Sequence, residues 1–116
     1  MVSEKRRAAR VSTDVSVTIR WGTQQESSHH VQNISMGGLF ISTHHILDLE
    51  TSVELEFQLP NGQRPIQCRG EVIWNSTSHP ERAGGQPGIG VRLLSLGFSD
   101  LRSLEKFIGG ALAPKS

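Results

Sequence analysis

The residues best suited to chemistry in this sequence are a cluster of cations and a polar turn. Lys5-Arg6-Arg7-Ala8-Ala9-Arg10 places four cations within six residues, and no other stretch is comparably charged. Further along, Asn33-Ile34-Ser35-Met36-Gly37-Gly38 places an amide and a hydroxyl before two adjacent glycines. Arginine pairs bidentately with anions such as phosphate, and glycine lets the backbone approach another group closely. Together the two segments predict one anion site.

Each segment also has a plainer explanation when it is taken alone. A short basic run is usually a solvated tail. Asn33 and Ser35 could hydrogen-bond only the backbone of their own turn, as these side chains often do. Both explanations stay open at the level of sequence, because an anion site requires the two segments to meet in the fold.

The positive charge of the chain is local. The formal net charge is +1, from 12 basic and 11 acidic residues. Because four basic and no acidic residues lie within residues 5–10, the rest of the chain is net negative. A protein that coats nucleic acid carries a basic face over much of its domain, and a single-strand platform needs more aromatic rings than two Trp and four Phe. The distribution favours a small anionic ligand or a short docking arm and argues against a nucleic-acid partner.

Length and composition predict one soluble domain. The 116 residues suit a single modest core. No apolar run approaches the 18 residues of a membrane span, and no signal-peptide pattern opens the sequence, so we expect a cytoplasmic protein without a direct membrane span. The single cysteine, Cys68, excludes an internal disulfide and a multi-thiolate metal site, which is consistent with a reducing compartment.

Hydrophobic periodicity predicts six short strands and one C-terminal helix. The strands are expected at residues 15–21, 29–33, 39–42, 53–59, 66–74 and 89–93, with polar loops at 22–28 and 75–87. The helix is expected at 99–109, with Ser99 as N-cap and Gly109 at its end. Six short strands with open edges would aggregate, so the pattern favours an antiparallel barrel or sandwich closed by the helix. We expect a basic arm at 1–13, a barrel with its helix at 14–110 and a tail at 111–116.

The sequence resembles the PilZ domain family, the bacterial receptor module for cyclic di-GMP. The family's Arg-x-x-x-Arg is matched by Arg6-Arg7-Ala8-Ala9-Arg10, and its [Asp/Asn]-x-Ser-x-x-Gly by Asn33-Ile34-Ser35-Met36-Gly37-Gly38. The resemblance spans residues 4–108, because Gly70-Glu71-Val72-Ile73-Trp74 and Gly88-Ile89-Gly90-Val91-Arg92-Leu93 also match the later strands of the family. It implies an all-β fold: a six-stranded antiparallel β-barrel closed by one α-helix.

The resemblance also implies a set of ligand-binding residues. Cyclic di-GMP carries two phosphates and two guanines, and arginine can serve both, through bidentate bonds or stacking. Asn33 is expected to accept a hydrogen bond from guanine N1–H or N2–H. A lysine precedes the arginine motif where many relatives have arginine, which leaves open whether one ligand or a stacked pair binds. The residues expected to bind cyclic di-GMP are Lys5, Arg6, Arg10, Asn33, Ser35, Gly37 and Gly38.

The implied function is that of a stand-alone receptor. Binding of cyclic di-GMP is expected to order the N-terminal arm and relay a signal to an unidentified effector protein in motility, biofilm or surface-polysaccharide control. An adaptor of the same fold that does not bind the nucleotide is the alternative, and non-specific RNA or DNA binding through the arm is a third possibility. The oligomeric state, monomer or dimer, stays open.

The remaining reactive residues predict neither catalysis nor a metal or cofactor site. No nucleophile elbow, Walker loop or His-Glu-x-x-His motif is present, so the chain is not expected to be an enzyme. Adjacent histidines on a strand point to opposite faces and cannot chelate one ion as a pair. Cys68 and Trp74 share the phase of Ile66 and Val72, which predicts that both lie in the core. The five histidines, expected at the surface or in turns, are His29, His30, His44, His45 and His79.

Overall fold

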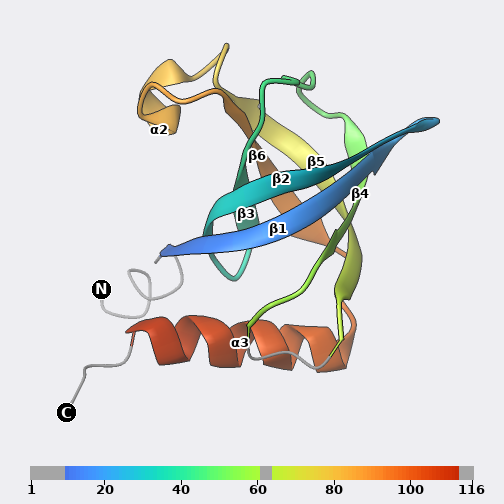
Figure 1. Cartoon of the computed structure of the whole chain (residues 1–116), viewed down its shortest axis with the longest axis vertical. Helices are drawn as coiled ribbons and strands as arrows, with labels where there is room; N and C mark the ends of the chain where they lie inside the picture. Colours follow the sequence, from blue (N-terminus) through green and yellow to red (C-terminus); the bar gives the residue numbers. More distant parts are fainter. Residues whose placement is uncertain (1–9, 61–63, 113–116) are drawn as a thin grey trace.

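A computed structural model describes residues 10–60 and 64–112 of the chain. In these residues six strands form a closed antiparallel barrel in the order β1-β2-β3-β6-β5-β4 (Figure 1). The elements are β1 (Val11–Trp21), β2 (Gln24–Ile34), β3 (Gly38–Ser42), β4 (Ser52–Phe57), β5 (Ile66–Asn75), α2 (Pro80–Ala83), β6 (Gly88–Leu94) and α3 (Phe98–Leu112). The prediction of a six-stranded antiparallel barrel with a C-terminal helix is confirmed.

Strict alternation of apolar and polar residues builds the barrel wall. In β4, Val53, Leu55 and Phe57 are buried, while the residues between them face solvent. The same alternation puts Ile89 and Val91 of β6 inside. Because side chains along a strand alternate between its two faces, each strand supplies one apolar row to a single core.

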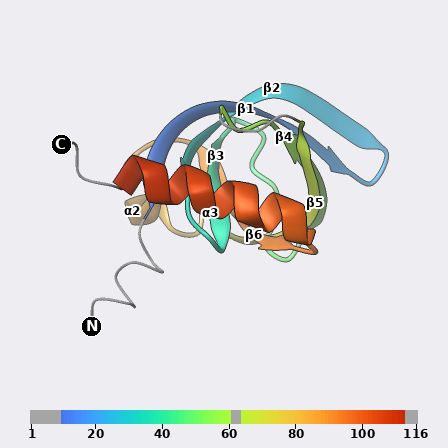
Figure 2. The same cartoon turned by 90° about the horizontal axis from the view of Figure 1, so that it is seen from below.

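Helix α3 closes one end of the barrel. Figure 2 shows it lying across the barrel mouth, and Leu104 and Ile108 pack into the main core from it. The helix extends beyond the predicted 99–109 at both ends. Its first turn is formed by a hydrogen bond of 2.9 Å from Leu101 N–H to the Gly97 carbonyl, which places Ser99 inside the helix and not at its cap. None of the helices in the described parts of the chain is both long and apolar enough to cross a membrane.

The β1–β2 hairpin is longer than the sequence pattern suggested. Trp21 pairs directly with Gln24, so the tight turn at residues 22–23, where Gly22 has a φ of 57°, replaces the predicted loop at 22–28. At the other end, Val11 pairs with Ile34, so residues 11–13 belong to β1 and not to the predicted arm. At the turn end, backbone pairing carries β2 through exposed polar residues such as Gln24 and Gln25, whereas at the other end Val11 and Ile34 are buried in the core.

A β-bulge at Ile73 reverses the faces of β5. Val72 pairs with Val91 and Trp74 with Gly90, so the extra residue turns Trp74 to the outside of the barrel. There the Trp74 ring stacks on Phe40, with ring centroids 5.1 Å apart and planes at 6°, and both side chains are buried. The prediction that Trp74 is buried is confirmed, but its assignment to the face of the main core is wrong, because it belongs to a second, outer aromatic cluster.

Candidate functional site

The hairpin brings Arg10 and Asn33 into contact. Residue 10 directly precedes β1, and the pairing of Ser12 with Asn33 places it beside the end of β2. Arg10 Nη1 donates a hydrogen bond of 2.6 Å to Asn33 Oδ1. Because a guanidinium offers only donors, the Asn33 atom that faces it is the oxygen. One residue from each of the two polar segments thus lies on the same outer surface of the barrel.

Ser35 closes the turn that follows β2. Its backbone N–H donates to the Gly38 carbonyl at 2.9 Å, and its hydroxyl lies 3.4 Å from the same oxygen. The side chain is only 8% exposed. Ser35 therefore hydrogen-bonds its own turn, as the plainer of the two explanations predicted. Asn33 does not follow that explanation, because its side chain bonds Arg10.

The two glycines of the turn have different roles. A Cβ on Gly38 would lie 2.6 Å from the Val91 carbonyl oxygen, so the approach of β3 to β6 requires glycine at this position. A Cβ on Gly37 would have nothing within 4 Å. The Gly37 carbonyl accepts a hydrogen bond from Leu93 N–H at 3.0 Å, which ties the turn to β6. Gly37 is exposed, so it leaves an open backbone surface next to the rigid position of Gly38.

The rest of the basic cluster lies outside the described residues. Lys5 and Arg6, both expected to bind the ligand, precede residue 10, where the structural description begins. Of the seven residues predicted for the site, the structure brings together Arg10, Asn33, Ser35, Gly37 and Gly38.

Strand register adds a charged pair that the sequence motifs did not indicate. Gly38 pairs with Arg92 on β6, and Arg92 pairs with Glu71 on β5. Arg92 Nη2 lies 2.5 Å from Glu71 Oε1. Alternation along β6, with Val91 inside, was the available signal that Arg92 faces outward, but its position opposite Gly38 depends on long-range pairing.

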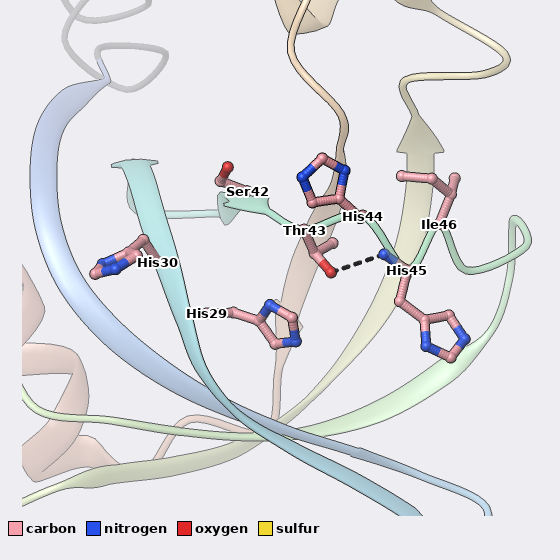
Figure 3. A pocket seen from close by; sticks show the side chains of 7 residues that line it. All are labelled: His29, His30, Ser42, Thr43, His44, His45 and Ile46. Atoms are coloured by element: carbon pink, nitrogen blue, oxygen red, sulfur yellow. Dashed lines mark hydrogen bonds between the residues drawn. The ribbon is translucent and has the colours of Figure 1, made fainter.

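Most of the histidines line a different surface. An open hollow of about 580 Å³ is lined by His29, His30, Ser42, Thr43, His44, His45 and Ile46 (Figure 3). As the strand pattern predicted, His29 and His30 point to opposite sides of β2. His30 Nδ1 lies 3.4 Å from Asp14 Oδ1, while His45 packs edge-on against Trp21. Within residues 10–60 and 64–112, no three His, Cys, Asp or Glu side chains are grouped so that they could hold a metal ion.

Cys68 is a buried part of the main core, as its phase predicted. Burial raises the pKa of the Cys68 thiol to about 11, and the negative charge of Asp100 adds to the shift. The thiol is therefore protonated at neutral pH. Since the thiolate is the nucleophilic form, the buried Cys68 thiol is a poor nucleophile at neutral pH.

Solved structures share this architecture. The structure of the Bacillus subtilis inhibitor of motility (MotI/DgrA) matches with a TM-score of 0.71 at 16% identity, over 85% of this chain and 47% of that one. This chain therefore spans about half the length of that protein. The PilZ domain of Escherichia coli YcgR with c-di-GMP matches with a TM-score of 0.63 at 15% identity, over 92% of this chain and 91% of that one. At these identities the likeness shows the fold.

Sequence comparison identifies the family. No curated protein sequence matches this chain. The family model described as PilZ domain matches residues 4–110, which include both polar segments, all six strands and most of α3. The resemblance noted from the two motifs is confirmed, and the chain belongs to the PilZ domain family.

Proposed function

We propose that this protein binds cyclic di-GMP on the outer barrel surface beside the β2–β3 turn. The observation that carries the proposal is the Arg10–Asn33 hydrogen bond, which joins the two family motifs into one surface. A structural neighbour, the PilZ domain of Escherichia coli YcgR, was solved with c-di-GMP. The proposed ligand-binding residues are Lys5, Arg6, Arg10, Asn33, Ser35, Gly37 and Gly38.

The donors and acceptors of this surface suit a guanine dinucleotide. Asn33 Oδ1 has two lone pairs, so it can accept a guanine N–H while it keeps the bond from Arg10. The Arg10 guanidinium has five N–H donors in a planar fork, a geometry that suits phosphate oxygens or guanine O6 and N7. Gly37 adds exposed backbone that a ring or a phosphate can approach. Ser35 acts mainly by holding the turn in place.

The relay that we propose is a change in the N-terminal arm. In this proposal, binding of the ligand orders residues 4–10 of the arm against the barrel. Fixing about six backbone residues costs on the order of 6–12 kcal/mol of conformational entropy. About four charge-assisted bonds from two arginines return roughly 6–12 kcal/mol, so ordering of the arm depends on the ligand. An effector protein that contacts this surface would then distinguish the two states, and no catalytic step is required.

The proposal is tested by calorimetric titration of the wild-type protein with cyclic di-GMP, with GTP as the control ligand. We expect saturable binding with a Kd in the micromolar range, about −8 kcal/mol, and no comparable binding of GTP. Absence of binding up to millimolar cyclic di-GMP would favour the adaptor that does not respond to the nucleotide. Equal binding of GTP and cyclic di-GMP would indicate a general anion surface.

A further inference from the structure

We propose that Arg92 is a further ligand-binding arginine of this surface and that Glu71 holds its guanidinium in the absence of ligand. This inference rests on the proposed binding of cyclic di-GMP and adds a residue that neither motif contains. Its basis is the strand register around Gly38 and the exposure of the Arg92–Glu71 pair.

Arg92 lies on the same outer face as Asn33. Asn33 pairs with Phe40, and Gly38, two residues before Phe40, pairs with Arg92. Asn33 and Arg92 are therefore two strands apart and two residues apart along the strands, which separates their Cα atoms by about 12 Å. A ligand with two bases joined through two phosphates is large enough to contact both side chains.

No side chain separates these two groups at the position of Gly38. Packing of β3 on β6 requires glycine there, so β3 presents no side chain beside Arg92, while Phe40 is its residue beside Asn33. The Leu93 N–H, which bonds the Gly37 carbonyl at 3.0 Å, fixes the turn relative to the strand that carries Arg92. The turn and Arg92 thus form one rigid unit across β3 and β6.

Glu71 holds the Arg92 guanidinium without burying it. The Arg92 side chain is 56% exposed and that of Glu71 is 29% exposed. An ion pair at such a surface contributes little to stability, so an anionic ligand can take the place of the carboxylate. An arginine whose partner is easily exchanged can add a cation to the site when the ligand arrives, while Glu71 balances the charge of Arg92 in its absence.

The chain contains a matched control pair. Arg20 Nη2 and Glu54 Oε1 lie 2.8 Å apart across β1 and β4, with exposures of 51% and 56%. Arg20 follows Arg10 by ten residues along β1, which is about 33 Å of extended chain. Substitutions in this pair change the net charge of the protein by the same amount as substitutions in the Arg92–Glu71 pair, but far from the site.

The test compares four variants by titration with cyclic di-GMP at about 150 mM salt, where distant charges are screened. We expect R92Q to weaken binding about 10-fold, because a charge-assisted hydrogen bond is lost. We expect E71Q to tighten binding about threefold, because the competing carboxylate is removed. R20Q and E54Q should each stay within about twofold of the wild type, because a remote surface charge is screened. Circular dichroism and thermal unfolding verify that all four variants are folded.

The outcomes separate this inference from the proposed function. If the wild type binds and R92Q binds like R20Q, Arg92 is not part of the site and the inference is overturned. Weaker binding by E71Q than by E54Q would also overturn it, because Glu71 would then contact the ligand. Absence of binding by the wild type would overturn the proposed function itself, and the inference with it.

Discussion

Arg10 and Asn33 are 23 positions apart in the sequence, and a hydrogen bond of 2.6 Å joins their side chains across the β1–β2 hairpin. The bond depends on an antiparallel register in which Val11 meets Ile34 and Ser12 meets Asn33. Because β2 then leads directly into the turn that Ser35 closes, the hairpin positions the cation, the amide and the glycines relative to one another. The geometry of the candidate site is therefore a consequence of the β1–β2 register and of the turn that follows β2.

The two glycines of the turn should respond differently to substitution. Gly38→Ala should lower the free energy of unfolding by about 1–3 kcal/mol, because the new Cβ meets the Val91 carbonyl, which cannot move without shifting β6. Gly37→Ala should change it by no more than about 0.5 kcal/mol, because the position is open. Urea unfolding of both variants measures the difference. Equal destabilisation by the two substitutions would show that β3 and β6 are farther apart at Gly38 than in this structure.

The outer aromatic cluster should contribute to stability as strongly as a residue of the main core. Trp74→Ala removes a buried ring that stacks on Phe40 over the space left by Gly90, and should cost about 3–5 kcal/mol of unfolding free energy. The measurement is again urea unfolding, with Ile73→Ala as the control, since Ile73 is exposed at the bulge. If Trp74→Ala costs no more than Ile73→Ala, the ring is not packed as the structure shows.

The Cys68 thiol should make stability depend on pH in the alkaline range. Burial raises the pKa of Cys68 in the folded state from 9.0 to about 11, so the folded protein favours the protonated thiol. The protonated thiol's contribution to the free energy of unfolding is fully present below pH 9 and is lost as the pH rises to about 11. The loss should be on the order of 1–3 kcal/mol, and Cys68→Val should lack this component.

Thiol reactivity provides an independent check of the same burial. At pH 8, a thiol reagent should react slowly with native Cys68 and fast after unfolding in urea, because the native thiol is both buried and protonated. Fast reaction with the native protein would contradict the buried position. The pH dependence then could not be attributed to Cys68.

The barrel could be predicted from local patterns because most of its strands show their own alternation of apolar and polar residues. The alternation through Val53, Leu55 and Phe57 identifies a half-buried strand without reference to its neighbours. Trp74 was placed on the wrong face because one extra residue in β5 reverses every later side chain. The apolar Ile73 breaks the alternation, but this break alone does not distinguish a bulge from a strand that is covered on both faces. The turn end of the hairpin was missed because exposed polar residues show no periodicity, and the other end was missed because Val11 is a single apolar residue between the basic cluster and two polar residues.

The candidate site could be predicted in part for a related reason. The basic cluster that ends at Arg10 and the turn that begins at Asn33 are each a short continuous stretch of sequence. The chemistry of each stretch could therefore be recognised before its position in the fold was known. Arg92 could not be recognised in this way, because its proximity to Gly38 arises from the pairing of β3 with β6, two strands far apart in the chain. Long-range register is the information that single-sequence patterns lack.

The central claim is that the surface joining Arg10 and Asn33 binds cyclic di-GMP, and one calorimetric comparison tests it most directly. Cyclic di-GMP is titrated into the wild type, Arg10→Ala and Arg20→Ala under identical conditions. Arg10→Ala should weaken binding roughly 10- to 150-fold, because a charge-assisted hydrogen bond is lost, while Arg20→Ala should bind like the wild type. Equal affinity of Arg10→Ala and the wild type would contradict the account, because the ligand would then bind elsewhere on the protein.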